Sequence, residues 1–160
     1  MATELKTLCS ALVVVGLLLA GGIVHGQEAK NERDAERIAE IEKFVHHYFR
    51  TWSDVEMDAY ADCFLNEAVI QFIDGRGQLH SQAKRPFIAE QRQVQSKNPG
   101  KETAETVEIR LEPNVARAIV YWKLTMGNRI EYGYDHFTLA RQDGKWKIVN
   151  LLFYKVDPAP

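Results

Sequence analysis

The spacing of the apolar residues changes once along this chain, and that change constrains the fold more than any other feature. From Ile38 to Trp52 the apolar residues recur at spacings of 3, 4, 3 and 4, which is the period of an amphipathic helix. After the break at residues 98–100 they recur at every second position, as in strands with one buried face. Helices first and hairpin-linked strands afterwards predict an α+β fold, with helices packed on one face of an antiparallel sheet.

Turn and capping signals set the boundaries of these elements. Ser53 and Glu56 resemble a capping box that opens a second helix, and Pro86 marks the start of a third. Residues 74–77 form a turn, and His80 falls in the polar connector that follows it. In order, we predict two helices over residues 38–52 and 53–66, a strand over 68–74, a third helix from 86, and strands over 106–112, 115–126, 129–141 and 145–156.

The N-terminal residues have the pattern of a targeting signal. Leu8–Val24 is an uncharged run of 17 residues that ends in small residues suited to a cleavage site. We predict a signal peptide over residues 1–26, a flexible polar leader over residues 27–34 and one domain over residues 35–157. Cleavage predicts an exported protein, periplasmic or secreted, with no membrane association after removal of the signal. A permanent anchor helix is the alternative, because 17 residues is near the lower limit for crossing a bilayer.

The composition excludes several classes of function. The chain has 20 Lys and Arg residues against 22 Asp and Glu, so it lacks the basic excess of a nucleic-acid-binding protein. Cleavage leaves Cys63 as the only thiol, in a setting that predicts a core residue. His46 and His47 point about 100° apart on a helix, which is a poor arrangement for a metal ligand pair. With no metal-ligand spacing and no phosphate-binding loop, the sequence predicts no metal and no cofactor.

Three local motifs resemble a known superfamily. They are Phe44-Val45-x-x-Tyr48 followed by Trp52, Asp62-x-Phe64-x-x-Glu67-Ala68, and Asp135-His136-Phe137-Thr138-Leu139 ahead of Asp143-Gly144-Lys145-Trp146-Lys147-Ile148. With the order of elements over residues 35–156, they resemble the nuclear transport factor 2-like superfamily, which includes SnoaL-like polyketide cyclases and ketosteroid isomerases. The resemblance implies a cone-shaped domain with three N-terminal helices on a curved antiparallel sheet. It does not imply one activity, because this fold hosts enzymes, binders and dimerisation modules.

The resemblance assigns roles to two residues. Tyr48 and Asp135 occupy the places of a tyrosine and a protonated aspartic acid that donate hydrogen bonds to an oxyanion in the ketosteroid isomerases. Alternation puts Asp135 on an apolar strand face, a setting that raises the pKa of a carboxyl. Phe72 stands where those isomerases have their general base. Asp74 has two interpretations, a displaced base at the pocket mouth or a turn residue that caps its own backbone, and the second is favoured.

These residues lead to a prediction of one cavity between the first helix and the sheet, lined by Tyr48, Trp52, Phe72 and Asp135, with Asp74 at its mouth. Such a cavity suits a small apolar or aromatic ligand with a carbonyl or phenolic oxygen, and binding of that ligand is the first hypothesis. The first alternative is a cofactor-independent isomerase, cyclase or dehydratase that uses Asp135 and Tyr48. The second is a dimerisation or accessory module whose pocket is filled by its own side chains.

Aromatic residues occur on both faces of the long strands, as Tyr121 and Trp122 illustrate. One layer of helices covers only one face of a sheet. The sequence therefore predicts a homodimer formed through the outer face.

Overall fold

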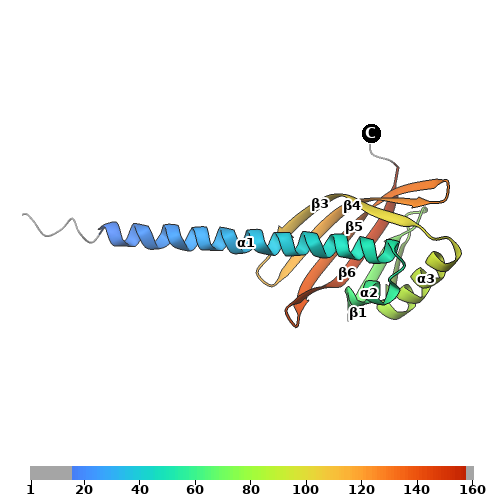
Figure 1. Ribbon diagram of the computed structural model, residues 1–160, viewed down its shortest axis with the longest axis horizontal. Helices are drawn as coiled ribbons and strands as arrows, with labels where there is room; N and C mark the ends of the chain where they lie inside the picture. Colours follow the sequence, from blue (N-terminus) through green and yellow to red (C-terminus); the bar gives the residue numbers. More distant parts are fainter. Residues whose placement is uncertain (1–15, 158–160) are drawn as a thin grey trace, which may run out of the picture. The chain divides into compact units, whose positions relative to one another are not determined.

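The computed structural model describes residues 16–157, and the chain divides into two compact units at Arg37–Ile38. Of the first unit, the structure describes the first part of helix α1. The second unit holds the rest of α1 and all later elements (Figure 1). In chain order the elements are α1 (Gly16–Ser53), α2 (Met57–Asp62), β1 (Phe64–Ile73), β2 (Leu79–Ala83), α3 (Lys84–Lys97), β3 (Lys101–Leu111), β4 (Val115–Met126), β5 (Arg129–Gln142) and β6 (Lys145–Val156).

The structure differs from the sequence-based picture at the start of α1. Residues 27–34, predicted as a flexible leader, are helical. No Gly or Pro interrupts residues 27–53, and Glu, Ala, Lys and Arg in the polar segment are good helix formers. Of the predicted signal peptide, residues 1–15 lie outside the described residues, and residues 16–26 belong to α1. Between residues 16 and 157, no helix is long and apolar enough to cross a membrane.

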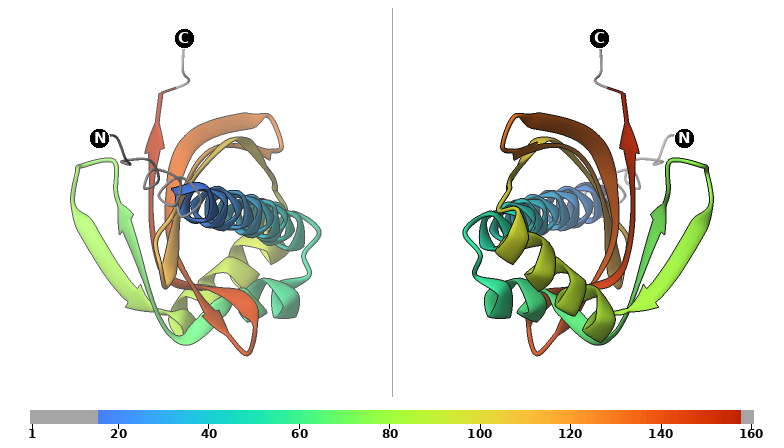
Figure 2. Two further views of the ribbon diagram at one scale, coloured as in Figure 1. Left: turned by 90° about the vertical axis from the view of Figure 1, so that its left-hand side faces the viewer. Right: turned by 90° about the vertical axis from the view of Figure 1, so that its right-hand side faces the viewer.

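The second unit is α+β, with a curved six-stranded sheet in the order β2-β1-β6-β5-β4-β3 (Figures 1 and 2). The long hairpins β3–β4, β4–β5 and β5–β6 form as predicted. The sheet is not purely antiparallel, because β1 pairs with β6 in parallel. The chain leaves β1 through β2 and α3 and crosses to the far edge at β3, so β6 returns alongside β1 in the same direction. The third helix is also not N-terminal, since α3 follows two strands.

Three local predictions were wrong. Ser53 does not cap a second helix; its hydroxyl bonds to the backbone of Glu102 instead, and α2 begins after Glu56 without a side-chain cap. Phe64 opens β1 rather than closing α2. The connector that contains His80 is a strand, β2, which lies at the sheet edge and is exposed at most positions. A strand without a buried face has no alternating apolar residues, so the sequence carried no signal for it.

The core lies between the concave face of the sheet and the helices (Figure 2). Ile41 and Val45 of α1 are fully buried against Val120, Leu139 and Ile148 of the sheet. The helical period is therefore confirmed from Ile41 to Trp52, whereas Ile38 is exposed, and the alternation of the long strands is confirmed. Some of the inward positions of β4, β5 and β6, among them Trp122, Asp135 and Phe153, line the candidate site together with Tyr48 and Trp52 of α1.

Candidate functional site

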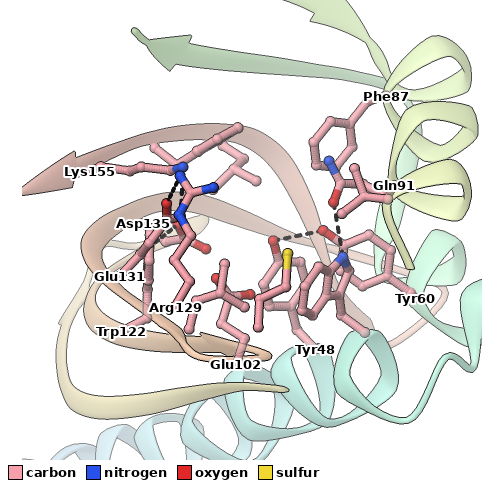
Figure 3. Close-up of a pocket in the computed structure, with 16 residues that line it drawn as sticks. Tyr48, Tyr60, Phe87, Gln91, Glu102, Trp122, Arg129, Glu131, Asp135 and Lys155 are labelled. Carbon is pink, nitrogen blue, oxygen red and sulfur yellow. Dashed lines mark hydrogen bonds and ion pairs between the residues drawn. The ribbon is translucent and has the colours of Figure 1, made fainter. Parts of the chain in front are cut away.

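A cavity of about 230 Å³ opens between the concave face of the sheet and the helices. Six aromatic side chains from α1, α2, α3, β4 and β6 line it, together with several carboxyl and cationic groups (Figure 3). Three of the predicted residues, Tyr48, Trp52 and Asp135, line it together. The sequence therefore identified the cavity and one of its acidic groups.

Asp135 lies at the closed end and is only 4% exposed. The indole nitrogen of Trp122 donates a hydrogen bond of 2.8 Å to Asp135 Oδ1. Trp122 and Gly133 are register partners on β4 and β5, and a Cβ at Gly133 would come within 2.2 Å of the Trp122 ring. Gly133 thus leaves the space that the indole needs in order to reach Asp135.

Burial dominates the electrostatics of Asp135. Loss of solvent raises the pKa of its carboxyl from 3.8 to about 7, while the interactions with Trp122 and Tyr48 lower it. The apolar strand face predicted for Asp135 accounts for this direction. At neutral pH a substantial fraction of this carboxyl carries a proton.

Glu102 also lines this cavity, and the sequence did not predict it. It enters the same cavity from β3, and Figure 3 shows Glu102 and Asp135 approaching from two different strands. Burial, and then the charge of Asp135, raise the pKa of Glu102 well above its ordinary value. The Ser53 hydroxyl fixes this part of β3, because it accepts from the Glu102 amide at 2.8 Å and donates to the Glu102 carbonyl at 2.9 Å. Asp135 is buried and Glu102 is half-buried, and two neighbouring carboxyls with little access to solvent do not ionise together easily, which favours retention of a proton by the pair at neutral pH.

Two tyrosines add hydroxyl groups at this end. Tyr48 and Tyr60 share a hydrogen bond of 3.0 Å between their hydroxyls. Burial raises the pKa of both well above 10, so both remain protonated. The Tyr48 ring packs edge-on against Phe137 at 5.1 Å, which fixes it beside the strand that carries Asp135. The closed end therefore combines an acid pair with phenolic hydroxyls inside aromatic walls.

The remaining wall has different chemistry. On the helical side, the Trp52 indole donates to the Gln91 side chain at 2.9 Å. At the open end, Glu131 lies between Arg129 and Lys155, with the lysine ammonium 2.6 Å from the carboxylate. The cavity thus has acids with raised pKa values inside and an ion-paired carboxylate at its mouth.

Phe72 and Asp74 do not line this cavity; they line a neighbouring one of about 410 Å³. Phe72 stacks on Phe153 at 5.6 Å, and Phe153 belongs to the walls of both cavities. Asp74 accepts from the amides of Arg76 and Gln78, and its other oxygen is 2.9 Å from His80 Nε2. These bonds support its interpretation as a turn residue.

The structure offers no alternative centre of metal or thiol chemistry within the part of the chain that it describes. Over residues 16–157, no group of three or more His, Cys, Asp or Glu is arranged to hold a metal ion. Cys63 is buried, and loss of solvent raises the pKa of its thiol to about 12. That thiol is protonated at neutral pH and is a poor nucleophile.

The order of strands and the helix-covered cavity define a nuclear transport factor 2-like domain, the superfamily that the sequence motifs predicted. The family model described as putative lumazine-binding matches residues 36–154, which is most of the chain. The chain belongs to this family. No curated protein matches the chain significantly.

Solved structures with the same fold come from several bacteria. A protein of unknown function from Mycobacterium tuberculosis has a TM-score of 0.69 and 16% identity, over 79% of this chain and 76% of that one. A nuclear transport factor 2-like protein with a cystatin-like fold from Novosphingobium aromaticivorans has a TM-score of 0.67 and 11% identity, over 82% and 89%. One of unknown function from Shewanella baltica has a TM-score of 0.60 and 15% identity, over 78% and 97%. At these identities the similarity establishes the fold alone.

Proposed function

We propose that this domain binds a small planar molecule whose ring carries neighbouring N–H and C=O groups. The observation that carries the proposal is the Asp135–Glu102 pair at the closed end of an aromatic cavity. Two carboxyls that retain one proton offer a hydrogen-bond donor and acceptors side by side, which complement such a ring edge. The rings of Tyr48, Tyr60 and Trp122 supply flat apolar surface for the rest of the molecule.

The family description supports a ligand of this class. Lumazine is a fused two-ring heterocycle with N–H and C=O groups on one edge. The cavity of about 230 Å³ is smaller than the roughly 300–1,000 Å³ typical of drug-sized ligands, so it suits one fused ring system. Open volume beside Asp135 also favours a binding domain over an accessory module with a filled pocket.

Lumazine itself is the probe that tests this proposal. We expect it to bind, with quenching of its fluorescence by the aromatic walls and a rise in the melting temperature of the protein. Asp135→Asn and Glu102→Gln should each weaken binding roughly tenfold or more, the usual effect of losing a hydrogen bond to a charged group. Glu108→Gln is the matched control, because Glu108 lies on the same strand but is exposed and pairs with Ile119 on the outer face. Absence of binding, or unchanged affinity in Asp135→Asn, would contradict the proposal.

Acid–base catalysis is a second candidate, favoured by the presence of two titratable groups in one cavity. The ionised carboxyl of the Asp135–Glu102 pair takes a proton from the carbon beside a ligand carbonyl and returns it to another carbon. The protonated carboxyl and the Tyr48 hydroxyl donate hydrogen bonds to the carbonyl oxygen as negative charge develops on it. No cofactor is needed for this exchange.

A β,γ-unsaturated cyclic ketone tests the catalytic candidate, since its conjugated isomer has a distinct ultraviolet absorbance. We expect the wild-type protein to accelerate the conversion and Asp135→Asn and Glu102→Gln to abolish the acceleration. Binding of lumazine without any conversion of the ketone would contradict the catalytic candidate and leave the binding function in place.

We also propose that the domain forms a homodimer through the outer face of its sheet. Tyr134 contacts Tyr121 at 5.2 Å and Tyr154 at 5.9 Å between ring centroids, and Tyr154 stacks on His136 at 5.6 Å. An aromatic cluster of this kind on the face opposite the helices suits an isologous contact. Light scattering at micromolar concentration should give twice the chain mass; a monomeric mass would contradict the proposal.

Export is the remaining proposal from the sequence. Cleavage after residue 26 is expected to yield a mature chain outside the cytoplasm. Intact-mass analysis of the fractionated protein tests this, and recovery of the full-length chain in the membrane fraction would contradict it.

A further inference from the structure

The open end of the cavity contains charged residues that have no role in the proposed binding of the ring at Asp135. Arg129 and Lys155 both pair with Glu131, so two positive charges face one negative charge. The side chains of Arg129 and Lys155 are 67% and 59% exposed, whereas that of Glu131 is 14% exposed. Each cation keeps further N–H groups that Glu131 does not use.

Strand register determines how far Glu131 and Lys155 lie from Asp135. Glu131, Gly133 and Asp135 alternate onto the concave face of β5, and Lys155 of β6 is the register partner of Gly133. At the rise of a strand, Lys155 is therefore roughly 7 Å and Glu131 roughly 13 Å from Asp135 along the sheet. A fused two-ring molecule with a short substituent spans that interval.

We propose that the cavity takes a planar heterocycle bearing an anionic group, a carboxylate or a phosphate, which lies between Arg129 and Lys155 while the ring faces Asp135 and Glu102. This inference rests on the proposed binding function and adds the charge and orientation of the ligand. Among the described residues that line the cavity, Arg129 and Lys155 are the only cations, and both are at the open end. Carboxyls at the closed end disfavour an anion there, so only one orientation satisfies both ends (Figure 3).

Glu131 then has a specific role, because it competes with the ligand for the same two cations. Its carboxylate holds Arg129 and Lys155 in place while the cavity is empty, and it repels an incoming anion at short range. Removing the charge of Glu131 should therefore strengthen the binding of an anionic ligand, whereas removing either cation should weaken it. A merely structural ion pair would not produce effects of opposite sign.

The experiment compares lumazine with 6-carboxylumazine, which has the same ring and one added carboxylate, at neutral pH. The measured quantity is the ratio of the two dissociation constants. For the wild-type protein we expect the carboxylate form to bind more tightly, by a ratio that falls as salt is added because exposed charges are screened. Arg129→Gln and Lys155→Gln should each lower that preference roughly two- to fivefold, the range of a half-exposed ion pair, and Glu131→Gln should raise it.

Arg117→Gln is the matched control. Arg117 is 64% exposed and pairs with Glu112 at 3.1 Å, but it lies on the outer face of β4 and does not line the cavity. Equal affinity for the two ligands, or a preference that the three mouth variants and added salt leave unchanged, would overturn the inference while the binding function stands. Failure of both ligands to bind would overturn the binding function and this inference together.

Discussion

The carboxyl groups at the two ends of the cavity have opposite electrostatic environments. At the open end Glu131 is surrounded by two cations and its charge is balanced by ion pairs. At the closed end Asp135 and Glu102 are not ion-paired with any cation among the described residues that line the cavity, and burial raises the pKa of both. A carboxyl group is thus ion-paired at one end and has a raised pKa at the other. The difference comes from solvent access and neighbours rather than from the residue type.

The largest effect is expected from a substitution that disrupts the packing at the closed end. In Gly133→Ala the new Cβ would come within 2.2 Å of the Trp122 ring and 2.3 Å of the Tyr154 carbonyl oxygen. We expect a loss of about 3 kcal/mol in the free energy of unfolding, measured by denaturant titration. Gly75→Ala is the control, since nothing lies within 4 Å of its added Cβ. Equal stability of the two variants would mean that the indole does not need this space.

The next largest effect is expected from a substitution that removes one hydrogen bond at the closed end. Trp122→Phe leaves Asp135 without its 2.8 Å donor, and we expect a loss of about 1–3 kcal/mol in stability. The pKa of Asp135 should also rise, because the Trp122 bond lowers it. Trp146→Phe is the comparison, since that indole donates to the exposed Glu40 at 3.2 Å and should matter less. The opposite ranking would contradict the account of the closed end.

The two ends should also differ in their dependence on pH. The pKa of Asp135 is raised in the folded protein from 3.8 to about 7, so between these two pH values the folded state binds more protons than the unfolded chain. Stability contributed by the protonated group is therefore fully present below about pH 3.8 and is lost as pH rises through about 7. Asp135→Asn should flatten this part of the stability profile in thermal melts from acidic to alkaline pH. An unchanged slope would assign the titration to another group.

The smallest effect belongs to the open end. Arg129→Gln and Lys155→Gln remove partners of Glu131 whose side chains are more than half exposed. Each should change the free energy of unfolding by less than about 1 kcal/mol, since solvent screens such pairs. A loss comparable to that of Trp122→Phe would show that the mouth is part of the structural core instead.

Periodicity predicted the parts of the site that lie on regular elements. Tyr48 and Trp52 follow the helical stripe of α1, and Asp135 follows the alternation of β5, so all three reach one cavity. Their faces are determined by local geometry, which the sequence carries. The added family resemblance distinguished Asp135 from other acidic residues on inward strand positions.

Glu102 was missed because β3 is irregular. Counting in steps of two from Glu108 puts Glu102 on the same, outer face, but a bulge between Ala104 and Thr106 shifts the register. Glu102 consequently pairs with Leu124, on the inner face, whereas Glu108 pairs with Ile119 on the outer face. A single extra residue in a strand moves every following side chain to the opposite face of the sheet. The local composition does not predict where such a bulge occurs.

Phe72 was assigned to the wrong cavity for a different reason. Alternation correctly predicts which face of β1 it occupies, but not which strand lies beside β1. The parallel pairing with β6 puts Phe72 next to Phe153, whose ring stands in the walls of both cavities. Strand order is a long-range property, and the sequence pattern of one strand does not specify it.

The central claim is that Asp135 and Glu102 retain a proton between them at neutral pH. Carbon-13 NMR titration of the two side-chain carboxyls tests it most directly, with Asp135→Asn and Glu102→Gln used to assign the signals. We expect at least one of the two carboxyls to be protonated at neutral pH, with coupled titration steps that change in each variant. Two carboxyls that titrate independently near the ordinary values of Asp and Glu would contradict the claim.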